Sequence, residues 1–195
     1  MKTKRKSLLL LVSLVMLMAL TVGGTLALLI ADTEPVVNTF TPGSTDIKVE
    51  ETFDQTTKSN VKVTNNGDVP VYIRVAIIPT WEDSDGDPVG VAASLSDLDI
   101  DWGAEDDTEA APGNNWVKGA DGFWYYTEQV AADASTEQLI ESATVQTANA
   151  YHMNLQILAQ SIQAEPDEAV GEAWSNDKVT VTGNNGTLTV TDESN

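Results

Sequence analysis

Apolar and polar residues alternate with a period of two along much of the chain after residue 45, which is the pattern of half-buried β-strands. The longest such run covers residues 69–78, where one face is expected to carry Val71, Ile73, Val75 and Ile77. Tyr72 and Arg74 would lie on the opposite face. Because Pro70 has no N–H to donate to a sheet, this strand is expected to begin after it or to lie at an edge.

Shorter alternating runs predict further strands, several of them separated by turns that contain glycine. These strands are expected at residues 46–50, 60–65, 116–118, 123–126, 178–182 and 187–191. The two aromatic runs flank Gly119 and Gly122 and are predicted to pair as a hairpin, as are the last two runs. The sequence Asn-Gly-Asp at 66–68 indicates a tight connection into the strand at 69–78.

Other stretches are less regular. Residues 135–138, Ser-Thr-Glu-Gln, fit a capping box that opens a helix, but the residues after them suit strands equally well. In residues 151–164 the alternation slips at Leu158, which fits a bulge or one helical turn, and we favour a strand with a bulge. Pro166 is expected to open a short helix that ends near Trp174. The whole pattern predicts an all-β fold, an antiparallel sandwich or barrel with one or two short helices.

The first 27 residues predict a secretory signal peptide. Four basic residues between Lys2 and Lys6 precede an apolar run over residues 8–22, and Gly-Gly-Thr-Leu-Ala follows with small side chains that fit a signal peptidase. Cleavage is expected between Ala27 and Leu28, with Ala31 as the second choice. The alternative is an uncleaved membrane anchor, although the apolar run reaches the about 20 residues of a spanning helix only by including residues 23–25.

Charge narrows the classes of partner. All 30 acids but only six of the ten basic residues follow residue 27, so the exported chain carries a formal charge of −24. Such a surface repels nucleic acid and anionic lipid, and we therefore expect no nucleic-acid partner and no membrane contact beyond the signal. Copies of the chain also repel one another, so self-assembly would need calcium, lower pH or strong backbone pairing. The chain has no cysteine, hence no disulfide stabilises it.

Four stretches resemble the TasA/camelysin family of secreted Gram-positive proteins. They are the Gly-Gly-Thr-Leu-Ala end of the signal and residues 38–47, 61–75 and 122–126. The resemblance covers the signal and most of the mature chain, and the acidic residues 89–112, interpreted as a solvated loop, match least. It implies a jelly-roll-like sandwich over residues 43–195, trimming by a SipW-type signal peptidase, and a place at the cell surface or in the biofilm matrix.

The resemblance also implies a route to fibres. In TasA-like proteins the mature N-terminal segment can pair with the next subunit by donor-strand exchange, and here residues 28–42 would be that segment. Alternate apolar side chains would then fill grooves of the neighbour, namely Leu28, Ile30, Val36 and Phe40. Pro35 and Pro42 would interrupt the pairing. The expected partners are other copies of the chain, the signal peptidase during export, and other matrix proteins.

Two clusters suggest ligands. Asp83, Asp85 and Asp87 flank Gly86 and are candidates for calcium, the single cofactor that the sequence suggests, although their spacing departs from an EF-hand and fits an acidic turn better. Trp116, Trp124 and Tyr126 could form a face for a glycan or a host protein, in which case the chain would be a monomeric binding module. The alternative is that these aromatic residues pack across strands with one side buried.

The residues give little support for an enzymatic function. Camelysin is classed with metallopeptidases, but a zincin needs two histidines and a glutamate, and His152 is the chain's sole histidine. There is no Gly-x-Ser-x-Gly motif, and a glycosidase cannot be judged from acid counts when 30 acids guarantee chance pairs. We therefore expect no catalytic residues and a secreted structural protein, with a camelysin-like metallopeptidase as the enzymatic alternative.

Overall fold

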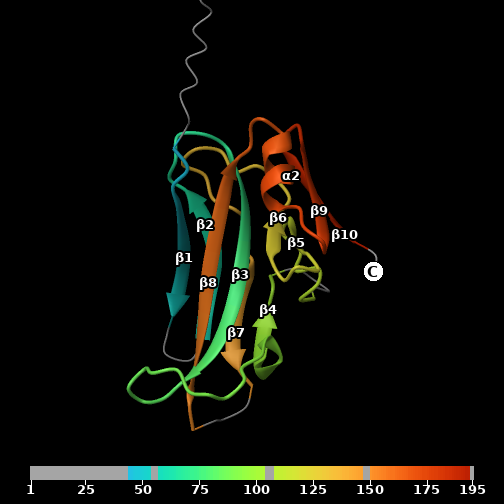
Figure 1. Cartoon of the computed structure of the whole chain (residues 1–195). Helices are drawn as coiled ribbons and strands as arrows, with labels where there is room; N and C mark the ends of the chain where they lie inside the picture. Colours follow the sequence, from blue (N-terminus) through green and yellow to red (C-terminus); the bar gives the residue numbers. More distant parts are fainter. Residues whose placement is uncertain (1–43, 54–56, 104–107, 147–149, 194–195) are drawn as a thin grey trace, which may run out of the picture. The chain divides into compact units, whose positions relative to one another are not determined.

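Antiparallel strands make up most of the described residues, which are 44–53, 57–103, 108–146 and 150–193 of the computed structural model (Figure 1). The chain from Gly43 onwards forms one compact unit. Sheet A has the strand order β1-β2-β7-β4, with β1 at Ile47–Phe53, β2 at Thr57–Asn65, β7 at Ile140–Val145 and β4 at Leu98–Asp101. Sheet B has the order β5-β6-β3-β8, with β5 at Trp116–Lys118, β6 at Trp124–Tyr126, β3 at Val71–Glu82 and β8 at His152–Gln163.

The main core lies between the two sheets. Sheet A contributes Val61, Val63, Leu98 and Ile140, and sheet B contributes Val71, Ile73, Val75, Ile77, Trp116, Trp124, Tyr126 and Leu155. The predicted alternation in β3 is therefore confirmed, because its four odd-numbered aliphatic residues face sheet A while Tyr72 faces away. This packing confirms the predicted all-β antiparallel sandwich.

A third layer covers part of the outer face of sheet B. It consists of helix α2 (Glu168–Trp174) and a hairpin of β9 (Val179–Asn184) and β10 (Thr187–Asp192). The sequence predicted the helix and the hairpin, but not that they form a layer of their own. Val170, Val181 and Leu188 pack with Tyr72 and Tyr125 in a second buried cluster. The fit is close at Gly183, where an added Cβ would come within 2.9 Å of the Asp167 carbonyl oxygen. β3 is consequently covered on both faces along its first half.

The connection at residues 66–68 is tight, as predicted, but it is not a hairpin. β2 belongs to sheet A and β3 to sheet B, so the turn carries the chain from one sheet to the other. The fully buried Asn65 stabilises this crossing, because its Nδ2 donates to the carbonyls of Val69 and Val130 at 2.9 and 3.0 Å. Its Oδ1 accepts from the Gly67 N–H at 2.9 Å.

The predicted bulge in residues 151–164 is wrong, although the predicted strand is right. β8 pairs with β3 one to one, from Val71 opposite Gln163 to Glu82 opposite His152. The hydrophobic alternation slips because one face of β8 is buried in its first half and the opposite face is buried near its end. Leu155 and Ile157 pack against the sandwich core, whereas Ile162 packs against the third layer on the other face.

The acidic stretch 89–112 is not a loop throughout. Its described residues include a 3₁₀ turn, η1 (Leu95–Asp97), with Ser94 as its cap, and then β4 at the edge of sheet A. Leu98 and Trp102 are buried in the main core. The sequence did not reveal this strand because its alternation lasts only four residues.

Residues 135–138 form no helix, and β7 begins at Ile140. Within the described ranges, no helix is long and apolar enough to cross a membrane. The predicted signal peptide, its cleavage site between Ala27 and Leu28, and the expected donor segment 28–42 lie outside the described residues.

Candidate functional site: the outer edge of β8

The aromatic residues expected to form a ligand face belong to the core. Trp116 and Trp124 are 2% exposed and Tyr126 is 7% exposed, and all three point between the sheets. The indole N–H groups donate to the carbonyls of Glu137 and Glu109 at 3.1 and 3.2 Å. The glycan-face hypothesis is therefore wrong for these three residues, and their aromatic pattern reflects packing.

In the acidic turn after β3, the carboxylate of Asp83 binds backbone N–H groups of the same turn. Asp83 Oδ1 accepts from the N–H groups of Asp85 and Asp87 at 2.9 and 3.0 Å, which closes the turn. In the part of the chain that the structure describes, no three acidic, histidine or cysteine side chains gather as metal ligands. Asp83, Asp85 and Asp87 thus do not converge on a common point, and His152 is not part of a ligand cluster either.

A different feature stands out, the strand β8 at one edge of sheet B (Figure 1). Its sequence is His-Met-Asn-Leu-Gln-Ile-Leu-Ala-Gln-Ser-Ile-Gln, twelve residues without an acid, a lysine, an arginine, a proline or a glycine. The rest of the chain after residue 27 is strongly acidic. β8 is therefore a long uncharged strand on a charged molecule.

The register shows which backbone groups of β8 point away from β3. In an antiparallel pair, alternate residues bond the partner strand, and those between them turn their N–H and C=O away. Ala164 donates to Pro70 at 2.9 Å, so the even-numbered residues of β8 bond β3. The odd-numbered residues from Met153 to Ser161 turn their backbone groups to the outer edge. Among the described residues, no strand pairs with that edge.

The other edges of the two large sheets carry the devices that normally block strand addition. β1 has Lys48, Glu50 and Glu51 and a break in register between Glu50 and Thr52. β4 is four residues long with two aspartates, and β5 is three residues long. β8 has none of these devices along twelve residues of unbroken register. It is the edge of the sandwich best suited to accept another strand.

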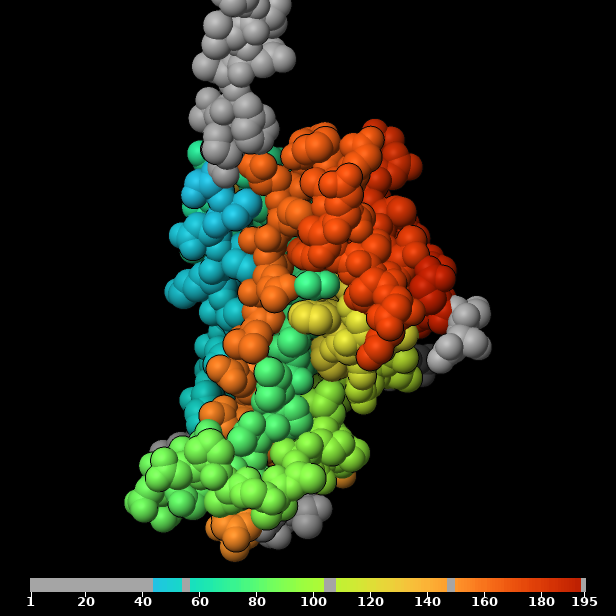
Figure 2. Space-filling view, viewed as in Figure 1, coloured from blue at the N-terminus to red at the C-terminus, as the bar shows by residue number. Residues whose placement is uncertain are grey.

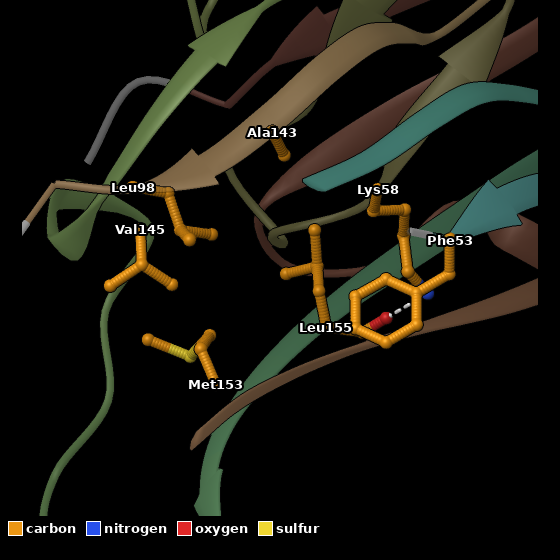
Figure 3. A pocket seen from close by; sticks show the side chains of 7 residues that line it. All are labelled: Phe53, Lys58, Leu98, Ala143, Val145, Met153 and Leu155. Atoms are coloured by element: carbon orange, nitrogen blue, oxygen red, sulfur yellow. Dashed lines mark hydrogen bonds between the residues drawn. The ribbon is translucent and has the colours of Figure 1, made fainter. Parts of the chain in front are cut away.

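A groove opens beside the first half of β8, at the end of the sandwich where the two sheets part (Figure 3). It is mostly apolar, and its lining residues are Phe53, Lys58, Leu98, Ala143, Val145, Met153 and Leu155. Its cavity volume is only about 20 Å³, room for about one water molecule, and so lies far below the range of about 300–1,000 Å³ that is usual for small-molecule sites. Phe53 stands at the rim and is 60% exposed.

Lys58 crosses this groove to reach β8. Its Nζ donates to the Leu155 carbonyl at 2.5 Å, and this carbonyl is one of those that point to the outer edge (Figure 3). The same Nζ lies 2.9 Å from both carboxylate oxygens of Glu51. The side chain of Lys58 is only 11% exposed. One edge carbonyl of β8 is therefore occupied by an ammonium group from the opposite sheet.

The outer face beside this edge also bears apolar side chains. Leu158 of β8 is 44% exposed, and Ile78 of β3, which is paired with Gln156, is 40% exposed. In the space-filling view, β8 runs along the visible face between β1 and β3 and beyond the cover of the third layer (Figure 2). A strand added at the outer edge of β8 would place its side chains beside Leu158.

Farther along sheet B, a charged cluster joins the sheet to the third layer. The guanidinium of Arg74 lies 4.1 Å from the ring centre of Phe123 and 4.9 Å from that of Trp174. Its Nε donates to Gln160 at 2.9 Å, and Tyr125 donates to Asp121 at 2.7 Å. The cluster holds α2 against the outer face of β3 and β8 and leaves the edge of β8 uncovered by α2.

This cluster predicts a loss of stability at alkaline pH. Burial raises the pKa of Tyr125 to about 12, and the hydrogen bond to Asp121 acts in the same direction. Because the fold favours the protonated phenol, this stabilisation is complete below pH 10, the ordinary pKa, and is lost as pH rises toward 12. The free energy of unfolding of Tyr125→Phe, measured by urea titration, should fall less steeply between these values than that of the native chain. Parallel declines would contradict this assignment.

No family model matches the chain, no curated protein matches it, and no solved structure matches it.

Proposed function

We propose that the chain is an exported, non-enzymatic protein of the cell surface or biofilm matrix whose copies associate by strand addition. The observation that carries this proposal is the outer edge of the uncharged strand β8, where the odd-numbered residues from Met153 to Ser161 turn their backbone groups away from β3 and no described strand pairs with them. The resemblance of four stretches to the TasA/camelysin family supports the same function and a Gram-positive source. After cleavage between Ala27 and Leu28, residues 28–42 of one copy would supply the strand that is added to the next.

Charge and length support residues 28–42 as the added strand. The segment contains two acids, Asp32 and Glu34, and no base, so it brings little of the −24 formal charge to the contact. Pro35 and Pro42 limit regular pairing to residues 28–34 and 36–41, seven and six residues long. Either stretch would span about 20 Å, roughly half of β8. The seven residues of β8 from Met153, at the groove, to Ala159 fit this length.

Backbone pairing explains how such acidic chains could associate. The added N–H and C=O groups would bond the odd-numbered residues of β8, and each bond would contribute about 0.5–1.5 kcal/mol. Apolar side chains such as Val36 and Phe40 would add buried surface. Calcium or mild acid would promote assembly by lowering the repulsion between copies, without any cofactor being required for the fold.

Hydrogen exchange of the assembled protein tests the choice of edge. The amides of Leu155, Ile157 and Ala159 point away from β3 and should exchange quickly in the monomer. In assemblies they should become protected, whereas Gln156 and Leu158 already bond β3 and should change little. Quenched exchange read by NMR measures this alternation. New protection confined to β1, β4 or β5, with β8 unchanged, would refute β8 as the acceptor.

A further inference from the structure

We infer that Lys58 acts as a gate for strand addition at the outer edge of β8. Its ammonium binds the Leu155 carbonyl in the free chain and releases this carbonyl to a backbone N–H of residues 28–42 from a second copy. This inference rests on the proposed function, since it assumes that residues 28–42 of one copy dock on β8 of another. It adds the residue that controls access and the shallow groove over which the first apolar side chain would pack.

The position of Lys58 is unusual for a lysine. Its neighbour on the same strand, Lys62, lies on the outer face of sheet A, where it pairs with Glu50 and both side chains are 38% exposed. Lys58 instead points between the sheets at the open end of the sandwich, where its methylene groups line an apolar groove. Lys58 pairs across sheet A with Ala143 on one side and Phe53 on the other, and both line the same groove.

The contacts of the Lys58 ammonium suit a reversible cap. The Leu155 carbonyl would otherwise present an unused acceptor beside an apolar groove, which costs free energy when it is poorly hydrated. Nζ supplies a donor at 2.5 Å, and Glu51, whose side chain is 36% exposed, compensates the charge. Because Glu51 remains beside Lys58 when the carbonyl is released, the ammonium would keep its ion partner during exchange.

A strand of a second copy is the occupant that fits. Its backbone N–H would replace Nζ as the donor to Leu155, so the bond lost is replaced by a bond of the same type. The groove is too small for a drug-sized molecule, so an apolar side chain of the added strand would pack over its mouth. Exposed Phe53 would close over that side chain from the rim. A segment with alternating apolar residues, as at 28–42, supplies both groups at once.

Lys58→Met tests the gate, with Lys62→Met as the matched control. Methionine keeps most of the stem but removes the donor, so the Leu155 carbonyl becomes available without competition. Both variants make the net charge more negative by one, which by itself slows assembly. We expect Lys58→Met of residues 28–195 to shorten the lag of assembly at least threefold by light scattering, and Lys62→Met to leave it unchanged or longer.

Each outcome has a defined meaning. Equal lag times for the two variants would overturn the gate while leaving strand addition intact. No assembly by the native chain or either variant, at neutral or acidic pH and with or without calcium, would overturn the gate and the proposed function together. Lys58→Met in a chain that begins at Gly43 must not assemble; if it does, the exposed groove captures something other than the N-terminal segment, and the inference fails. Equal melting temperatures of the monomers check that the variants fold.

Discussion

Replacing Ala159 by proline is expected to suppress assembly while the monomer remains folded. Ala159 pairs with Val75 at a position where its backbone N–H points away from β3, so the fold makes no ladder bond with it. Proline removes that N–H and places its ring at the outer edge. Loss of the bond and the steric clash together should weaken association about tenfold or more.

The control for Ala159→Pro is the same substitution at Gln156. The Gln156 N–H points toward Ile78 of β3, so proline there breaks the sheet itself and should lower the melting temperature of the monomer. Sedimentation velocity measures association, and circular dichroism measures melting. Assembly by Ala159→Pro at the native rate, with β8 intact, would show that copies meet at another surface.

Trp124→Ala should destabilise the chain more than any substitution on its surface. Trp124 is 2% exposed, lies 5.9 Å from the ring centre of Trp102, and donates its indole N–H to the Glu109 carbonyl. A buried tryptophan reduced to alanine leaves a cavity and an unpaired carbonyl, which costs about 3–5 kcal/mol. The melting temperature should fall by roughly 10 °C, since each kcal/mol is worth about 2–4 °C at this size.

Phe53→Ala is the contrasting substitution, because Phe53 is 60% exposed. Its monomer should lose less than about 1 kcal/mol, within the usual range for surface positions. Calorimetry of both variants makes the comparison. A Trp124→Ala chain as stable as Phe53→Ala would mean that the aromatic hairpin is not part of the core. In assembly, Phe53→Ala should slow the association of copies more than Trp124→Ala does, since Phe53 stands at the rim of the groove and Trp124 does not line it.

The sequence predicts most of the sandwich because period-two alternation follows directly from having one buried face. The strand at residues 69–78 begins after Pro70 and buries its odd-numbered aliphatic side chains, as expected. Alternation does not reveal which strands pair. The short turn at 66–68 has the chemistry of a hairpin, yet Asn65 holds it as a crossing between sheets.

The site was harder to predict for the same reason. The absence of charge in β8 is visible in the sequence, but an uncharged strand is ordinary in the middle of a sheet. Its meaning depends on its place at an edge, which only the pairing with β3 reveals. Lys58 gave no signal either, because Asn60 adopts a left-handed conformation with φ of 57°. Simple alternation within β2 is lost near that residue, and Lys58 faces inward together with Val61 and Val63.

The aromatic hairpin is the opposite case, because there the sequence suggests a ligand site and the structure shows core packing. Trp116, Trp124 and Tyr126 suggest a sugar-binding platform when only composition is considered. The hairpin is covered on both faces, by sheet A on one side and by α2 with Trp174 on the other. Residues of one type on one strand face indicate packing until exposure is known.

The most direct measurement is negative-stain electron microscopy of purified residues 28–195, at neutral and acidic pH, with and without calcium. A chain that begins at Gly43 is prepared in parallel. Strand addition by residues 28–42 predicts fibres from the longer chain alone, favoured by acid or calcium. Separate particles of uniform size from both chains in every condition, or equal fibres from both, would contradict it.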